Sequence, residues 1–213
     1  MASTRRACCS TWTTGLLSHA DAAVEDQLWL VRHGETEWSA NGRHTSTTDL
    51  PLTANGEAAA RKLVDALRGI EFEKVLTSPR QRAVHTAQLA GFSHAEVDAD
   101  LVEWAYGDYE GLTTVEIRET VPGWTIWTHT SPGGETGEQV SERLDRVIAK
   151  ARAVEGKTLV FAHGHSLRAL AVRWLGLDIA EGQRFVLDTS TVSVLGVDRG
   201  TQVVRSWNVP PAR

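Results

Sequence analysis

The chain has 213 residues and a formal net charge of −5, and 41% of its residues are hydrophobic. These values are ordinary for a folded α/β domain, and they argue against strong non-specific attraction to nucleic acid or to an anionic membrane. No apolar run approaches the roughly 20 residues that span a bilayer. Cys8 and Cys9 are adjacent, a spacing at which disulfides rarely form, so a reducing, cytoplasmic location is expected.

The N-terminal residues 1–26 are predicted to be a disordered tail, and residues 27–213 a single domain. The first 20 residues contain Arg5, Arg6 and many Ser and Thr but no acid, which also resembles an organelle transit peptide. An unstructured tail, or a start codon upstream of the true one, is the preferred explanation. A secretory signal is disfavoured because no continuous apolar segment is present.

The first half of the domain alternates short apolar runs with amphipathic segments. A run at residues 28–31 is typical of a buried strand. Thr53 can act as an N-cap for a helix with a single apolar stripe, formed by Ala59, Leu63, Leu67 and Ile70. A second strand is predicted at residues 74–77. Ser78 then suits the N-cap, and Pro79 the first position, of a helix that runs to Leu89.

The second half of the domain continues this alternation after a covering segment. A strand is predicted at residues 95–97, and residues 101–135 are expected to be loop and short helix over one end of the sheet. A helical stripe at residues 138–153 precedes a buried strand at 158–162, a helix from 166 to about 175, and β-rich stretches at 192–197 and 202–207. This order predicts an α/β fold with three αβα layers and a mostly parallel central sheet.

Polar groups follow each of three predicted strands, and parallel sheets collect their functional groups beyond the carboxyl ends of the strands. The strand ends carry Arg32 and His33, then residues 78–82, and then His163. Each alone has an ordinary explanation, such as a solvated strand end, an exposed first helical turn or a hydrogen-bonded loop histidine. Their coincidence at three strand ends instead indicates a site for an anion.

Six segments carry a family resemblance, in the same order along the chain: LVRHGETEW at 30–38, DLPLTANG at 49–56, SPRQRAVHTA at 78–87, LVEWAYGDYEG at 101–111, SPGGE at 131–135 and FAHGHSLR at 161–168. With these segments the chain resembles the histidine phosphatase superfamily, in its phosphoglycerate mutase-like branch. The resemblance implies the phosphoglycerate mutase-like fold and covers nearly everything from residue 27 onwards.

The resemblance also implies roles for individual residues. His33 matches the phosphorylated nucleophile, and Glu103 matches the proton donor. The positions that hold the phosphoryl oxygens are matched by Arg32, Arg82 and His163. Relatives line the substrate pocket at the positions of Ser39, Thr45, Ser78, Tyr106 and Arg168.

The residue types suit this chemistry. An unprotonated imidazole can attack phosphorus first and leave the second displacement to water, and nearby guanidinium charge disfavours the imidazolium form. Arginine forks match phosphoryl oxygens and stabilise their charge without a metal, so no cofactor is expected. His163 and His165 are two residues apart in a loop, which is not the ligand spacing of a metal site.

Three departures from family mutases favour a phosphatase. The chain is shorter in the covering region, Ser39 replaces the usual Asn, and Trp104-Ala105 replaces a basic-aromatic pair. The expected substrates are small phosphorylated metabolites, including sugar phosphates and bisphosphates, and the expected partners include no nucleic acid and no membrane, with a homodimer left open. Phosphoglycerate mutase remains the alternative. A catalytically silent regulatory relative would have lost a motif residue, and none is lost.

The covering segment contains three tryptophans: Trp104, Trp124 and Trp127. Tryptophans in such a segment usually contribute packing, because their large rings bury apolar surface. They could also form an apolar wall that selects the leaving group of the substrate. The sequence allows both roles together.

Overall fold

The computed structural model describes residues 26–212, so the predicted tail and both cysteines lie outside the described residues, apart from Asp26. Six strands form one sheet in the order β3-β2-β4-β1-β5-β6. Strands β3, β2, β4 and β1 are mutually parallel, β5 pairs antiparallel with β1, and β6 pairs antiparallel with β5. The strand bounds are β1 Gln27–Arg32, β2 Lys74–Thr77, β3 Glu96–Val97, β4 Lys157–Ala162, β5 Val192–Asp198 and β6 Thr201–Val209. The predicted mostly parallel sheet is confirmed.

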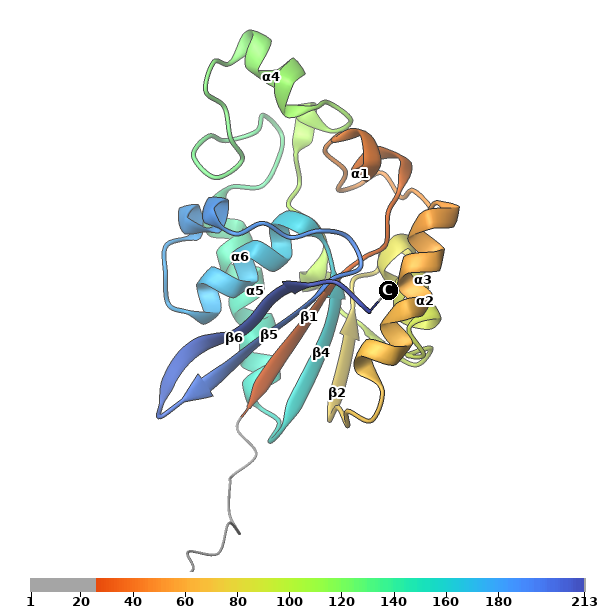
Figure 1. Cartoon of the computed structure of the whole chain (residues 1–213). Coiled ribbons are helices and arrows are strands. Elements are labelled where there is room, and N and C mark those ends of the chain that lie inside the picture. The colour runs from red at the N-terminus through yellow and green to blue at the C-terminus, as the bar shows by residue number, and fades with distance from the viewer. Residues whose placement is uncertain (1–25, 213) are drawn as a thin grey trace, which may run out of the picture.

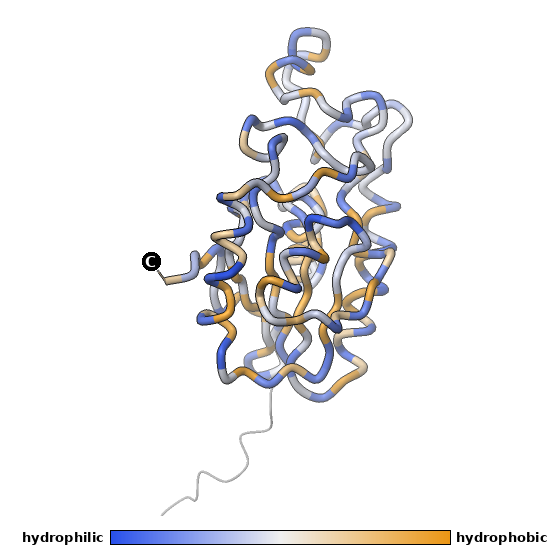
Figure 2. The backbone as a smooth tube through the Cα atoms, turned by 90° about the vertical axis from the view of Figure 1, so that its right-hand side faces the viewer, coloured by the Kyte–Doolittle hydropathy of each residue, from blue (hydrophilic) through white to orange (hydrophobic). Residues whose placement is uncertain are grey.

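Helices cover both faces of this sheet (Figure 1). They are α1 Glu37–Asn41, α2 Ala54–Leu67, α3 Gln81–Leu89, α4 Thr114–Thr120, α5 Gly137–Arg152 and α6 Gly164–Trp174, with 3-10 turns at Ala99–Leu101, Gly107–Tyr109 and Ile179–Arg184. The flanking helices alternate between hydrophobic and hydrophilic residues (Figure 2), as expected when one side of a helix packs against a sheet.

Alternate residues of the central strand β4 point to opposite layers, because successive side chains of a strand face opposite sides. Leu159 and Phe161 pack with α2 and α3 in one hydrophobic cluster. Val160 and Ala162 pack with α5 and α6 in the other. The two clusters lie on opposite faces of the sheet, each between the sheet and a layer of helices. The fold therefore has the three αβα layers that the sequence predicts.

Three predicted helix boundaries are wrong. Helix α6 begins at Gly164 and not at residue 166, so His165 lies in the first turn of a helix rather than in a loop. The stripe of α2 ends at Leu67 and does not reach Ile70, because the backbone leaves the helix at the extended residue Arg68 and then turns at Gly69 with φ of +74°. Ser78 does not cap α3, which begins at Gln81 after Arg80 and has no side-chain cap from Arg80. The carboxylate of Asp49 instead accepts the N–H of Gln81 at 2.9 Å, from a loop distant in sequence.

The segment that connects β3 to α5 rises above the carboxyl ends of the parallel strands and contains α4 (Figure 1). This confirms the predicted covering segment of loop and short helix. Its tryptophans Trp104, Trp124 and Trp127 are buried in the core cluster on the α5 and α6 side. Within residues 26–212, no helix has the length and apolar character needed to cross a membrane.

Candidate active site

The carboxyl ends of β1, β2 and β4 meet at one point of the sheet. The backbone N–H of His33 donates to the carbonyl of Ala162, and the N–H of Ser78 donates to the carbonyl of Phe161, each at 2.9 Å. This register places the ring of His33 beside that of His163, with centroids 5.1 Å apart in an edge-on arrangement. Two histidines separated by 130 positions are therefore neighbours because their strands are neighbours.

The His33 ring is buried and held by its own loop. Its Nδ1 lies 2.7 Å from the carbonyl oxygen of Gly34, which can only accept a hydrogen bond, so the proton of the neutral ring is on Nδ1. Burial lowers the pKa of His33 well below its ordinary value, and the charges of Arg82 and Arg32 lower it further. The ring is therefore neutral near pH 7, with its lone pair on Nε2.

The turn after His33 needs a glycine for steric reasons. A Cβ at Gly34 would lie 2.6 Å from the carbonyl oxygen of Gly56, closer than such atoms pack. The N–H of Gly34 donates to Oγ1 of Thr86 at 2.9 Å, and this hydroxyl in turn donates to the carbonyl of Arg82. The chain after His33 is thus fixed against both α2 and α3.

Arg82 is fully buried, and each of its three side-chain nitrogens donates at least one hydrogen bond. Its Nε donates to Nδ1 of His163 at 3.2 Å, and its two other nitrogens donate to backbone carbonyls of Thr45, Ser46 and Thr48. The side chain is therefore a fixed positive charge behind the two histidine rings. It does not line the pocket described below.

Arg32 has a free donor. Its Nη1 donates to the carbonyl of Leu187, whereas its buried Nε has no hydrogen-bond partner among the described residues. A buried guanidinium N–H without an acceptor is unusual, because leaving such a group unpaired costs free energy. The donor lies in a residue that lines the pocket, next to His33.

Both ring nitrogens of His163 are occupied. Nδ1 accepts from Arg82, so the proton of the neutral ring is on Nε2, which lies 2.7 Å from Oγ of Ser78. Burial lowers the pKa of His163 well below its ordinary value, and Arg82 adds to this effect. The ring and Ser78 lie behind the pocket rather than on its wall.

The Glu103 carboxyl group is held at the N-terminus of α6. Oε1 accepts from the backbone N–H groups of Trp104 and Ser166, and Oε2 accepts from that of His165. Glu103 is only 6% exposed but lines the pocket. Its position is therefore fixed by two backbone donors of α6 and by that of the next residue in the chain.

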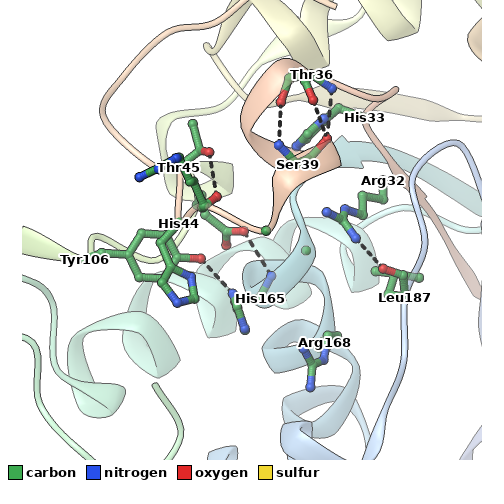
Figure 3. A pocket seen from close by; sticks show the side chains of 14 residues that line it. Arg32, His33, Thr36, Ser39, His44, Thr45, Tyr106, His165, Arg168 and Leu187 are labelled. Carbon is green, nitrogen blue, oxygen red and sulfur yellow. Dashed lines mark hydrogen bonds between the residues drawn. The ribbon is translucent and has the colours of Figure 1, made fainter. Parts of the chain in front are cut away.

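A pocket of about 160 Å³ lies above these residues (Figure 3). Seven of the residues predicted for the site line it: Arg32, His33, Ser39, Thr45, Glu103, Tyr106 and Arg168. The other three, Ser78, Arg82 and His163, stand behind its floor in contact with one another. All ten predicted residues thus belong to one connected arrangement, although not all face the pocket.

Two lining histidines were not predicted as site residues: His44 and His165. Together with Tyr106 they lie on the side of the pocket opposite Arg32 and His33 (Figure 3). The Tyr106 hydroxyl lies 2.6 Å from Nδ1 of His165, and the rings of His44 and Tyr106 are 4.6 Å apart. His165 lies within the FAHGHSLR segment, but the spacing of residues along the chain predicts neither of these two contacts.

Comparison with known proteins identifies the family of this arrangement. The family model described as histidine phosphatase superfamily (branch 1) matches residues 28–210. The chain belongs to this superfamily. It is 43% identical to an acid phosphatase of Mycobacterium tuberculosis, over 83% of this chain and 89% of that protein. It is 38% identical to sedoheptulose 1,7-bisphosphatase of Saccharomyces cerevisiae, over 70% of this chain and 68% of that protein.

A solved structure of an open reading frame product from Mycobacterium tuberculosis superposes with a TM-score of 0.84 and 40% identity. The match covers 87% of this chain and 98% of the solved chain. Membership in the histidine phosphatase superfamily confirms the predicted family and fold. The relatives named as phosphatases confirm the predicted enzyme class, a phosphoric monoester hydrolase.

Proposed function

We propose that this histidine phosphatase hydrolyses small phosphomonoesters in two displacements, with His33 as the transient carrier of the phosphoryl group. The observation that carries the proposal is the hydrogen bond from His33 Nδ1 to the Gly34 carbonyl. It leaves Nε2 as the nitrogen with a lone pair, in a ring that burial and two arginines keep neutral.

In the first displacement, Nε2 of His33 forms a bond to phosphorus and the bond from phosphorus to the ester oxygen breaks. Glu103 donates a proton to the departing alkoxide. In the second displacement, a water oxygen bonds to phosphorus, its proton passes to Glu103, and the phosphorus–nitrogen bond breaks. Atoms and protons balance, and both groups return to their starting states.

The arginines supply the charge that this reaction needs. In this proposal the unpaired Nε of Arg32, a residue that lines the pocket, donates to an oxygen of the transferring phosphoryl group. Arg82 contributes its positive charge from behind His33, and His163 can offer its Nε2–H by exchanging Ser78 for a phosphoryl oxygen. Fixed donors of this kind stabilise the charge of the transition state without reorganisation. The reaction then requires no metal or cofactor.

Small phosphorylated metabolites, including sugar phosphates and bisphosphates, are the proposed substrates. The names of two relatives, acid phosphatase and sedoheptulose 1,7-bisphosphatase, support this choice. The three departures from the mutase pattern, namely Ser39, the Trp104-Ala105 pair and the shorter covering region, favour hydrolysis over mutase chemistry. We further propose that residues 27–213 act as one catalytic domain in the cytoplasm, either as a monomer or as a homodimer, without a nucleic-acid or membrane partner.

A panel of phosphorylated metabolites, assayed for released phosphate with and without EDTA, tests this proposal. The wild-type chain should release phosphate in both conditions, and His33→Gln should lose at least about a thousandfold in rate. His94→Gln is the matched control, since His94 is exposed and outside the pocket. Equal rates for wild type and His33→Gln would overturn the proposal. Conversion of 3-phosphoglycerate to 2-phosphoglycerate outrunning phosphate release would replace hydrolysis with mutase activity.

A further inference from the structure

A second pocket of about 310 Å³ adjoins the catalytic pocket beneath the covering segment. The two pockets share His44 and His165 as lining residues. The rest of the second pocket is formed chiefly by Arg118, Trp124, Trp127 and Gln183. None of these four residues has a part in the proposed chemistry.

The shared wall carries no charge near neutral pH. Burial lowers the pKa of His44 to about 4 and lowers that of His165 well below its ordinary value. Burial also raises the pKa of Tyr106, so its hydroxyl stays protonated, and it shares a hydrogen bond of 2.6 Å with Nδ1 of His165. The neutral His165 ring has one N–H donor and one lone pair, so the shared wall is polar but uncharged.

Arg168 and Trp127 connect the two pockets. The guanidinium carbon of Arg168, which lines the catalytic pocket, lies 4.7 Å from the ring centroid of Trp127, which lines the second pocket. One face of the indole is therefore occupied by a cation, and stacking of this kind fixes both side chains. A molecule that extends from the phosphoryl site past His44 would enter a space walled by aromatic rings.

Trp124 offers a donor that nothing in the described residues satisfies. It lines the second pocket and is 1% exposed, yet its indole N–H has no hydrogen-bond partner. Buried indole N–H groups normally have an acceptor, because leaving them unpaired is costly. This donor points to a ligand with oxygen acceptors rather than a purely apolar one.

Arg118 offers a positive charge at the same pocket. Its Nε donates to the carbonyl of Trp124 at 2.9 Å, and within residues 26–212 no carboxylate forms an ion pair with it. Glu116 on the same helix is already engaged, with its carboxylate accepting from the N–H of Thr113 and paired with Arg43. The terminal nitrogens of Arg118 therefore remain available for an anion.

We propose that the second pocket binds the alcohol part of the substrate, and that this part is a hydroxylated chain or ring with a second anionic group. Arg118 binds that anion, Trp124 donates to a hydroxyl oxygen, and the indole rings contact the carbon skeleton. The inference rests on the proposed phosphatase function, which it extends from the phosphoryl group to the leaving group. Arg118 is then a specificity-determining residue that takes no part in the chemical step.

The variant Arg118→Gln tests the anion site with three probes: fructose 1,6-bisphosphate, fructose 6-phosphate and p-nitrophenyl phosphate. The ratio of kcat/KM for the bisphosphate to that for the monophosphate should fall about tenfold, mainly through KM, since one charge-assisted contact is lost. Activity on p-nitrophenyl phosphate should change less than twofold. Arg61→Gln is the matched control, an exposed arginine on α2 that is paired with Glu57. An unchanged ratio in Arg118→Gln overturns the inference.

Trp124→Phe tests the donor separately, because it keeps an aromatic ring and removes the N–H. Both fructose phosphates should lose about threefold to tenfold in kcat/KM relative to p-nitrophenyl phosphate. An equal loss on all three probes contradicts a contact with the leaving group, and a thermal melt shows whether packing has changed. If activity on p-nitrophenyl phosphate depends on His33 but neither variant changes the kcat/KM ratios between the probes, this inference alone is wrong. If activity survives in His33→Gln, the proposed function itself is wrong.

Discussion

The Nε2 atom of His163 lies 2.7 Å from Oγ of Ser78, and Nδ1 of the same ring accepts from Arg82. Ser78→Ala removes the acceptor and leaves a buried N–H unpaired. We expect the free energy of unfolding to fall by about 1–3 kcal/mol, and kcat/KM to fall because the His163 ring loses its fixed orientation. Urea denaturation and steady-state kinetics measure the two effects.

The control for this variant is Ser131→Ala, because Ser131 is also buried but its hydroxyl has no partner among the described residues. Its free energy of unfolding should change by less than that of Ser78→Ala, and its activity should stay near the wild-type value. Equal losses of stability and activity in the two variants would contradict a specific role for the hydrogen bond between Ser78 and His163.

Glu103→Gln should separate substrates by leaving group. Alkyl phosphates need a proton on the departing oxygen, so their kcat should fall by about 10²–10⁴. p-Nitrophenol leaves readily without one, so the first displacement should survive while the attack of water is slowed. Stopped-flow absorbance should then show a burst of nitrophenol equal to the enzyme concentration. Glu119→Gln, an exposed glutamate on α4, serves as control, and a uniform loss on both substrate types would argue against proton donation by Glu103.

Arg32→Gln should move the pH dependence as well as the rate. Desolvation is the largest cause that lowers the pKa of His33, and the charges of Arg82 and Arg32 follow. Wild type should therefore keep a neutral His33 well below pH 6.5. Removal of one positive charge raises this pKa and shifts the acidic limb of kcat/KM upwards, while the lost donor costs about 10²–10³ in rate.

Titration of the His33 ring by NMR in the free enzyme measures the shift without the ionisation of the substrate. Arg61→Gln, far from the site on α2, should leave the titration unchanged. A His33 pKa that is identical in wild type and Arg32→Gln would refute the electrostatic role of Arg32.

His44 should make the fold less stable in acid. Burial lowers its pKa from the ordinary 6.5 to about 4 in the folded chain. Between these values the unfolded chain binds a proton that the folded chain does not. The contribution of neutral His44 to the free energy of unfolding is therefore full above pH 6.5 and is lost as the pH falls towards 4. His44 alone should account for about 2 kcal/mol between pH 7 and pH 5. His44→Gln should flatten the pH dependence of the free energy of unfolding by that amount, whereas the exposed His94→Gln should not.

Local patterns in the sequence are sufficient for the sheet and for the placement of His33 and His163 at neighbouring strand ends. They fail where a contact joins distant segments. Ser78 suits an N-cap by type and position, but its hydroxyl is taken by His163, 85 positions away, and Asp49 serves α3 instead. Rules based on neighbouring residues cannot predict either contact, because each joins segments far apart in the sequence.

The second pocket illustrates the same limit. His44 and Arg118 belong to segments without a periodic signal, and they meet only because the covering segment folds back over the sheet. The sequence allowed the tryptophans to serve in packing and also as an apolar wall of a pocket, and these two interpretations are compatible. Trp124 and Trp127 are buried in the core cluster and also line a pocket.

The central claim is that His33 carries the phosphoryl group, and rapid quench in alkali followed by peptide mass spectrometry tests it most directly. Wild type and Glu103→Gln, mixed with p-nitrophenyl phosphate, should yield an acid-labile, alkali-stable phosphate on the peptide that contains His33. The label should be stronger in Glu103→Gln and absent in His33→Gln. Phosphate found on another side chain during turnover would contradict the account.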